Sequence, residues 1–403
     1  MIPRLRPPYT LTDLGRALTK SHSDSTHHFE RAFAAHFGFE YGVFFPFGRT
    51  AMHALLVALG WKNKKILAPA YTCAVIPQAI VASGNTPVFA DSAPDHFNVS
   101  PHTLNAAMHE TINMVIPTPI FGYPIDRTGY SKIIKDKAPE SFILFDAAHG
   151  FLVEDDRGVQ FSDADAVLFG LGPGKQISTL NGGMLLLRDK AIGQAVEEVR
   201  KKLCFSQNGA ASFGKTLYGT ALYAAFRYPL LNLTHWMEQQ TTFLHRFTDK
   251  YYGTLPTGIP DECYAYPFPF QAELGSIQLP MLDRFTQMRR ELAALYEERL
   301  GREGFSLFAH QGNPTWSHFP LLVRQRDTVL TLLQKRNVQC GKLIDYSCAD
   351  LPEYDQQTGD FPNATRFGAG MINLPIWPGL DSVAFEHVIS ALLYTREATP
   401  EAF

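Results

Sequence analysis

An aspartate at the end of an apolar run is the first residue with chemical potential. Asp146 follows Phe142–Phe145 in the sequence Phe145-Asp146-Ala147-Ala148-His149-Gly150. A carboxylate that ends a buried strand is costly unless it meets a cation or several hydrogen-bond donors. A protonated pyridine nitrogen is one such cation, and a carboxylate beside it would keep the ring an electron sink. Taken alone, Asp146 fits a helix cap or a structural ion pair better.

A glycine-rich loop with a lysine follows the next strand candidate. Its sequence is Gly170-Leu171-Gly172-Pro173-Gly174-Lys175, and these glycines let the backbone approach a ligand closely. Phe169 and Gln176 stand where a P-loop needs glycine and Ser or Thr, and a dinucleotide fingerprint needs glycine in place of the lysine. Such a lysine is commonly solvated surface. The strand entry Asn181-Gly182-Gly183 and the aspartate one strand earlier favour a functional lysine instead.

A third candidate, Gly48-Arg49-Thr50, lies between an apolar run and a helix. Backbone N–H groups at a helix N-terminus, with a hydroxyl and a guanidinium beside them, can bind phosphate. An ordinary helix cap by Thr50 is the alternative, and alone it is the simpler interpretation.

The elements that must position these residues alternate along the first half of the chain. Helix candidates at 74–82, 101–109 and 130–136 separate several of the apolar runs. This alternation predicts an α/β protein with a mostly parallel sheet sandwiched by helices, which binds ligands beyond the carboxyl ends of its strands. The runs are Tyr41–Phe45, Lys65–Ala68, Pro87–Ala90, Met114–Pro117, Phe142–Phe145, Ala166–Phe169 and Met184–Leu187.

The second half contains long helical stretches and a shorter alternation. We expect a large α/β domain at 1–255, with a helical insertion at about 205–250, and a small C-terminal α/β domain at 256–403. A Pro-rich passage at 251–270 marks the transition. Helices are expected at 189–204, 278–302, 327–336 and 382–394, and strands at Thr315–Leu322 and Met371–Leu374.

The composition argues against a nucleic-acid partner and for a reducing compartment. With 403 residues, 45% hydrophobic side chains and a net charge of −3, the chain offers no electrostatic case for nucleic acid. Five scattered cysteines lack metal-ligand spacing and suggest reduced thiols, so we expect a cytoplasmic protein without a metal site. The N-terminus lacks the apolar stretch of a signal peptide, and no segment is a good transmembrane helix.

Taken in order, the motifs resemble those of the DegT/DnrJ/StrS aminotransferase family, and the similarity runs nearly the whole chain. This family contains fold-type-I pyridoxal-phosphate enzymes that aminate keto-sugars. The motifs that carry the resemblance are Gly48–Met52, Pro69–Thr72, Pro87–Asp91, Asp146–His149, Lys175 with Asn181–Gly183, and Leu374–Leu380.

The resemblance implies a role for each matching residue. Lys175 corresponds to the catalytic Schiff-base lysine, Asp146 to the partner of the pyridine nitrogen, and His149 to the Gln or His that contacts the ring hydroxyl. Gly48, Arg49 and Thr50 correspond to the phosphate loop. The cofactor would be pyridoxal 5'-phosphate and the partners an amino-acid donor, plausibly glutamate, and a keto-sugar, in a homodimer.

Three positions depart from the family pattern. Gly170 stands where a Ser or Thr often binds the phosphate, and Cys73 stands where an aromatic side chain stacks on the cofactor ring. Both belong to the expected cofactor-binding set, with stacking either weaker or supplied by Tyr71. Pro267–Phe270 replaces the Asn and Arg that reach a neighbouring subunit's site, and the segment between Cys204 and Cys263 is longer than usual.

Alternatives to amino transfer remain at this stage. One is elimination or dehydration on the same scaffold, which Lys175 argues against because dehydrating relatives carry His there. Another is a binding protein that keeps the fold without catalysis. The apolar stretch Leu217–Met237 fits subunit packing best, ahead of a membrane-surface helix and a lid.

Overall fold

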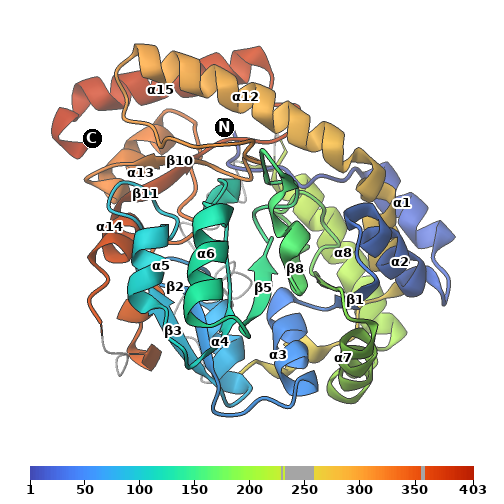
Figure 1. Ribbon diagram of the computed structural model, residues 1–403. Coiled ribbons are helices and arrows are strands. Elements are labelled where there is room, and N and C mark those ends of the chain that lie inside the picture. The colour runs from blue at the N-terminus through green and yellow to red at the C-terminus, as the bar shows by residue number, and fades with distance from the viewer. Residues whose placement is uncertain (228–229, 232–257, 355–358) are drawn as a thin grey trace.

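The structure is a computed structural model that describes residues 1–227, 230–231, 258–354 and 359–403. Its centre is a seven-stranded sheet with the order β1-β9-β8-β5-β4-β2-β3, in which β9 alone runs antiparallel to its neighbours (Figure 1). The expected mostly parallel α/β sheet is therefore confirmed. The strands are β1 Tyr41–Phe45, β2 Lys65–Pro69, β3 Thr86–Ala90, β4 Ile112–Val115, β5 Phe142–Asp146, β8 Ala166–Gly170 and β9 Gly183–Leu187.

Side chains of successive strand residues enter two separate cores, one on each face of the sheet. In β8, Ala166 and Leu168 pack with helices α3, α4 and α7, whereas Val167 and Phe169 pack with α2, α5 and α6. Both faces are apolar, which explains why these strands appear in the sequence as continuous hydrophobic runs. The helices are α2 Ser25–Phe37, α3 Gly48–Ala58, α4 Val75–Ala82, α5 Pro101–Ala107, α6 Arg127–Lys137 and α7 Lys190–Leu203.

The C-terminal part builds a third core around a two-stranded antiparallel sheet. Helix α12 runs along the top of the molecule from this part toward α1 and α2 (Figure 1). Its elements are α12 Leu282–Arg302, β10 Phe319–Leu322, α13 Arg326–Lys335, α14 Pro362–Gly370, β11 Met371–Leu374 and α15 Ser382–Ala398. Helix α11, Pro269–Gln278, packs against α1, Leu11–Lys20, and α2. The division of the chain near residue 256 stays a prediction.

The beginning of the chain is bound to this C-terminal part. Ile2 N–H donates to Asn337 O (2.7 Å), and Gln339 N–H donates to Ile2 O (3.0 Å). The indole N–H of Trp377 donates to Pro3 O (3.1 Å). This N-terminal strap runs past the glycine-rich loop, since a side chain on Gly174 would meet a Leu5 methyl at 3.1 Å.

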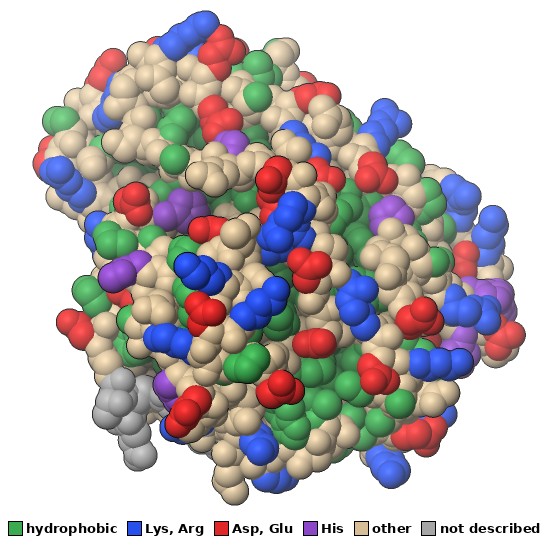
Figure 2. Space-filling model, in the orientation of Figure 1, with side chains coloured by type: hydrophobic (Ala, Val, Ile, Leu, Met, Phe, Trp, Pro, Cys, Tyr) green, Lys and Arg blue, Asp and Glu red, His purple; other side chains and the backbone are tan. Residues whose placement is uncertain are grey.

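The expected strand Thr315–Leu322 begins only at Phe319, because residues 315–318 form hydrogen bonds with another loop, described below. Within the expected helical insertion the structure shows α8, Gly209–Ala225, and the rest of the apolar stretch to Met237 lies largely outside the described residues. No helix in the described ranges is long and apolar enough to span a membrane. Lys, Arg, Asp and Glu side chains are interspersed over the face shown in Figure 2.

Candidate active site

Asp146 is the last residue of β5, at the carboxyl edge of the sheet. Only 5% of it is exposed, and its Oδ1 accepts the Ala148 N–H at 2.9 Å. Oδ2 makes no hydrogen bond within the described residues. Burial raises the pKa of Asp146, against the opposing effects of the Ala148 N–H and of the positive charge of Lys175. The site therefore holds a buried carboxylate with capacity for a cationic partner.

Lys175 reaches the same edge from the loop after β8, the strand paired with β5. A side chain on Gly170 would meet Lys175 Cε at 3.3 Å and Ala148 Cβ at 3.4 Å, so the lysine side chain lies beside the carboxyl ends of β8 and β5. Desolvation lowers the pKa of Lys175, while Cys73 and Asp146 favour its charged form. Its Nζ has no hydrogen bond or ion pair within the described ranges, which leaves the amine available to a ligand.

His149 is held as a neutral ring with a defined tautomer. The Phe121 N–H donates to His149 Nδ1 at 3.0 Å, so Nδ1 is an acceptor and the ring proton is on Nε2. Burial, and then the charges of Lys175 and His318, lower the pKa of His149 well below its usual value. The ring stacks on Phe121 with centroids 6.0 Å apart, and only 8% of the residue is exposed.

The predicted phosphate loop opens helix α3, whose hydrogen bonding starts with Ala51 N–H to Phe47 O (3.1 Å). Arg49 Nη1 donates to Gln78 Oε1 (2.9 Å), and the Thr50 hydroxyl donates to Cys263 O (2.6 Å). Both side chains are buried and hold α3 against neighbouring segments. The backbone N–H groups of this first turn remain the natural phosphate donors.

Cys73 and Gly170 lie near the lysine, whereas Tyr71 belongs to the C-terminal core. Cys73 acts electrostatically on Lys175 and is partly buried. The Tyr71 ring is fully buried between Phe121 and Phe367, and its hydroxyl donates to Ile344 O at 3.1 Å. Tyr71 is thus committed to packing. The structure brings together Asp146, His149, Gly170, Lys175 and Cys73 at one edge of the sheet.

One residue of this site was missed from the sequence. His318 comes immediately before β10, and its ring centroid lies 5.4 Å from that of His149. Lys175 influences its pKa as well. The sequence Ser317-His318-Phe319 contains no motif, and His318 comes 169 positions after His149, so nothing in the spacing connected the two imidazoles.

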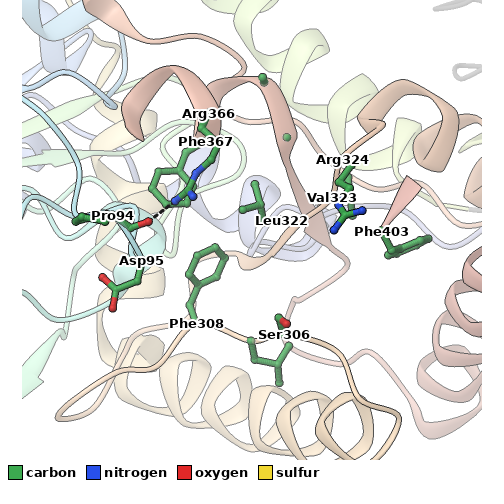
Figure 3. A pocket seen from close by; sticks show the side chains of 13 residues that line it. Pro94, Asp95, Ser306, Phe308, Leu322, Val323, Arg324, Arg366, Phe367 and Phe403 are labelled. Atoms are coloured by element: carbon green, nitrogen blue, oxygen red, sulfur yellow. Dashed lines mark hydrogen bonds between the residues drawn. The ribbon is translucent and has the colours of Figure 1, made fainter. Parts of the chain in front are cut away.

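A separate cavity of about 740 Å³ lies in the C-terminal part, and neither Asp146, His149, Lys175 nor His318 lines it. Figure 3 shows Arg366 reaching toward Pro94, with Phe308 and Leu322 between Asp95 and Arg324. The described residues contain no group of three or more His, Cys, Asp or Glu side chains that could hold a metal ion.

Comparison with known proteins identifies the architecture and the class of reaction. The model of the DegT/DnrJ/EryC1/StrS aminotransferase family matches residues 11–233 and 268–393. The chain belongs to this family. It is accordingly a pyridoxal-phosphate-dependent aminotransferase of fold type I, which confirms the predicted family, fold class, cofactor and enzyme class.

Relatives cover almost the full length of this aminotransferase. Spore coat polysaccharide biosynthesis protein SpsC of Bacillus subtilis is 25% identical over 379 residues, covering 90% of this chain and 87% of that protein. dTDP-4-amino-4,6-dideoxy-D-glucose transaminase of Shigella dysenteriae is 22% identical over 373 residues, covering 90% and 88%. The structure of S. venezuelae DesV in complex with a ketimine intermediate matches with a TM-score of 0.71 and 20% identity, covering 95% and 93%.

The residues present fit pyridoxal 5'-phosphate. Asp146 is 5% exposed, and its Oδ2 makes no hydrogen bond to the described part of the chain, which suits a protonated pyridine nitrogen. The missing Cβ of Gly170 leaves room beside the lysine stem, because a side chain there would touch both Lys175 and Ala148. Asp146, His149 and the first turn of α3 thus offer complementary groups for ring nitrogen, ring hydroxyl and phosphate.

Proposed function

We propose that this aminotransferase moves an amino group from an amino-acid donor, glutamate, to a keto-sugar that is linked to a nucleotide. The observation that carries the proposal is the convergence of Asp146 and Lys175 at one edge of the sheet. The name of the Shigella relative, a transaminase of a dTDP-linked amino sugar, supports the substrate class. The presence of Lys175 favours amino transfer over dehydration.

In this proposal Asp146 stabilises the charge of the cofactor ring and Lys175 transfers the proton. When bound, pyridoxal 5'-phosphate supplies an aldehyde that captures amines and a ring that withdraws electrons from the adjacent carbon. Asp146 holds the ring nitrogen in its protonated form. Lys175, whose pKa desolvation lowers, takes up and returns a proton at Nζ.

The remaining predicted residues orient the cofactor. His149 would donate Nε2–H to the ring hydroxyl, since the Phe121 N–H already occupies Nδ1. The N–H groups of Gly48, Arg49 and Thr50 would hold the phosphate at the start of α3. Gly170 and Cys73 would contact the cofactor, and because both residues are small they would leave space above the ring.

We further propose a cytoplasmic homodimer. Helix α8 exposes Phe213 and Leu217 to solvent, at 73% and 59% of their surface, and lies beside α1, which exposes Leu11 and Leu18. An apolar surface of this kind suits a second copy of the chain. None of the five cysteines, all of them in the described ranges, forms a disulfide, which suits a reducing compartment.

The direct test incubates the cofactor-loaded enzyme with ¹⁵N-glutamate and a panel of nucleotide-linked 4-keto-sugars. Mass spectrometry should find the label in an amino sugar, and the Lys175→Ala protein should give none. A sugar product that has lost oxygen without gaining nitrogen would instead establish dehydration. Failure to bind cofactor at all would favour a binding protein.

A further inference from the structure

The N-terminal strap carries Arg4 to the boundary between the lysine loop and the C-terminal sheet. The next residue, Leu5, lies against Gly174, one position before the lysine, since a side chain on that glycine would meet its methyl at 3.1 Å. The Arg4 N–H donates to Gln339 Oε1 (3.2 Å), and a side chain on Gly341 would meet Arg4 Cδ at 3.7 Å. The backbone and the stem of Arg4 are therefore held by the C-terminal part, while its neighbour borders the lysine loop.

The guanidinium of Arg4 forms no hydrogen bond or ion pair within the described ranges, and its Nε is buried. A buried Nε without a partner also occurs in arginines that donate through an Nη atom, which are Arg127, Arg200, Arg289 and Arg326. Arg4 has no such compensation. A buried donor that pairs with nothing in the protein is costly, so a group from outside the chain that accepts from it is favoured.

Asn373 of β11 supplies a second unpartnered donor beside the Arg4 stem. It is 2% exposed, and its Oδ1 accepts the Leu343 N–H (3.2 Å), which establishes that the other end of the amide is Nδ2. Nδ2 is buried without a partner in the described part of the chain. Asn373 Oδ1 and Arg4 Cδ each lie 3.7 Å from the position that a side chain on Gly341 would occupy. The two side chains thus border one small space, which the glycine leaves open.

The pairing of β10 with β11 places this space next to the second histidine of the site. Pro320 is the partner of Asn373 across the two strands, so His318 lies only two residues before that partner. The His318 ring is in turn 5.4 Å from the His149 ring, measured between centroids. Arg4 and Asn373 therefore stand at the end of the active site that the C-terminal part provides.

Positive charge predominates at this end of the site. Burial lowers the pKa of His318 most, followed by the charges of Lys175, Arg289 and Arg4. Arg289 donates to backbone carbonyls and, like Arg4, forms no ion pair with a described residue. The carboxylate of Asp146 acts on Lys175 and is the group that suits the pyridine nitrogen. An anionic group of a ligand would therefore be stabilised beside Arg4.

We propose that Arg4 and Asn373 form the subsite that binds a carboxylate of the amino donor. The N–H groups of a guanidinium match the two oxygens of a carboxylate, and Asn373 Nδ2 is a further donor. Glutamate, the proposed donor, carries two carboxylates close to its amine. The other anion that the enzyme meets is the diphosphate of the nucleotide-linked sugar, and the two half-reactions distinguish these sources. This inference rests on the proposed amino transfer.

The first measurement is the affinity of the cofactor-loaded enzyme for glutarate, a dicarboxylate without an amine, by calorimetry. Arg4→Met removes the charge and keeps an unbranched stem against Gly341. Asn373→Asp keeps the acceptor for the Leu343 N–H and replaces the donor by a carboxylate. Each substitution should weaken glutarate binding roughly 10–100-fold, because a hydrogen-bonded charge loses its partner. The uncharged analogue glutaramide should bind the parent and both variants equally.

The matched control is Arg6→Met, on the same strap. The Arg6 guanidinium lies over the Trp377 ring, and its charge interacts with Arg227 and Asp381. This variant should bind glutarate like the parent. In single turnovers Arg4→Met should raise the glutamate concentration for half-maximal rate by the factor seen with glutarate. Its half-reaction with the keto-sugar should keep the KM of the parent.

Parent-like glutarate binding in both site variants, or no glutarate binding by the parent, would overturn the proposal. A loss confined to the keto-sugar half-reaction would also overturn it, in favour of the diphosphate. Equal losses in Arg6→Met would assign the effect to the path of the strap, and loss of cofactor binding in both site variants would assign these groups to the cofactor. If the parent binds glutarate without reacting with glutamate, the subsite is supported and the proposed donor is wrong, which is a separate result.

Discussion

Two pairs of oppositely charged residues lie beside the same sheet. They differ in whether their charged groups form an ion pair and hydrogen bonds within the protein. Glu30 of α2 and Arg200 of α7 form an ion pair beside β1, with 5% and 1% of their surfaces exposed. Arg200 Nη1 also donates to Phe44 O (2.8 Å), and Phe44 N–H donates to Glu30 Oε1 (2.8 Å). The two charged groups are thus paired with each other and with the backbone of the strand, although Arg200 Nε has no partner in the described part of the chain.

At the carboxyl edge of the sheet, Asp146 and Lys175 lie close enough to influence each other, yet form no ion pair. Burial shifts both pKa values toward the neutral forms. Withdrawing a charged group from water without pairing it is costly, so the fold retains such groups where a ligand completes the set. The difference separates a charge pair that holds secondary structure together from one that is available for chemistry.

The largest effect should come from removing the free amine. Lys175→Ala should lower amino transfer by at least about 10³-fold, because this nitrogen both binds the cofactor and moves the proton. The visible absorbance of the bound cofactor should disappear as well. The exposed lysine of α7 gives the control Lys190→Ala, which should behave like the parent. Retention of either property in Lys175→Ala would place the reactive amine elsewhere.

Breaking the structural pair should affect stability instead of turnover. Arg200→Met leaves Glu30 buried without its cation, and should lower the free energy of unfolding by about 3–5 kcal/mol in denaturant titrations. Replacing Glu30 by Met in the same protein should restore much of this loss.

The matched control for that experiment is Arg299→Met. Arg299 pairs with Glu386 at 3.8 Å on the surface, where an ion pair contributes at most about 1 kcal/mol. Equal losses in Arg200→Met and Arg299→Met would remove the distinction between the two environments.

Asp146→Asn tests how much the charged Asp146 carboxylate destabilises the cofactor-free protein. The folded-state pKa of Asp146 is raised, so in the cofactor-free protein stability should fall as pH rises from 3.8 toward the raised value. In Asp146→Asn the free energy of unfolding should not fall over this pH range, and at neutral pH the variant should be more stable than the parent by roughly 1–3 kcal/mol. Its rate of amino transfer should be lower. Thermal unfolding of the cofactor-free proteins across pH measures it. A variant less stable than the parent at pH 7 would contradict the assignment.

The smallest change in stability is expected from His27, the exposed histidine beside Glu30. His27 Nδ1 lies 3.1 Å from Glu30 Oε2, but 56% of the His27 side chain is exposed. His27→Gln should therefore change the free energy of unfolding by less than about 1 kcal/mol. A loss as large as that of Arg200→Met would mean that the exposed side of the pair contributes as much as the buried side.

The central sheet could be predicted because each of its strands contains a short apolar run. Tyr41–Phe45 matches the prediction in both bounds. Strand β4 is displaced by two residues at both ends, and each of the others differs by one residue at one end. The prediction failed in the first half of Thr315–Leu322, where Thr315 and Trp316 precede the apolar residues of β10. There, hydrogen bonds to Gly122 and His149 override local preference for the first four residues.

The site was partly predictable for the same reason. Asp146 and Lys175 each follow a recognisable strand, so their meeting at one edge follows from a parallel sheet. The contacts of Arg49 and Thr50 with Gln78 and Cys263 depend on helix packing, which spacing does not reveal. His318 arrives through a loop whose path is set by hydrogen bonds to distant backbone.

The N-terminal strap has a consequence for synthesis in the cell. Arg4 N–H donates to the Gln339 side chain, 335 residues later. At ribosomal rates of about 5–20 residues per second, the strap waits roughly 20–70 s for its partner to emerge. During that interval the loop around Lys175 lacks the cover of Leu5. The nascent enzyme should therefore acquire its finished pocket only after translation is nearly complete.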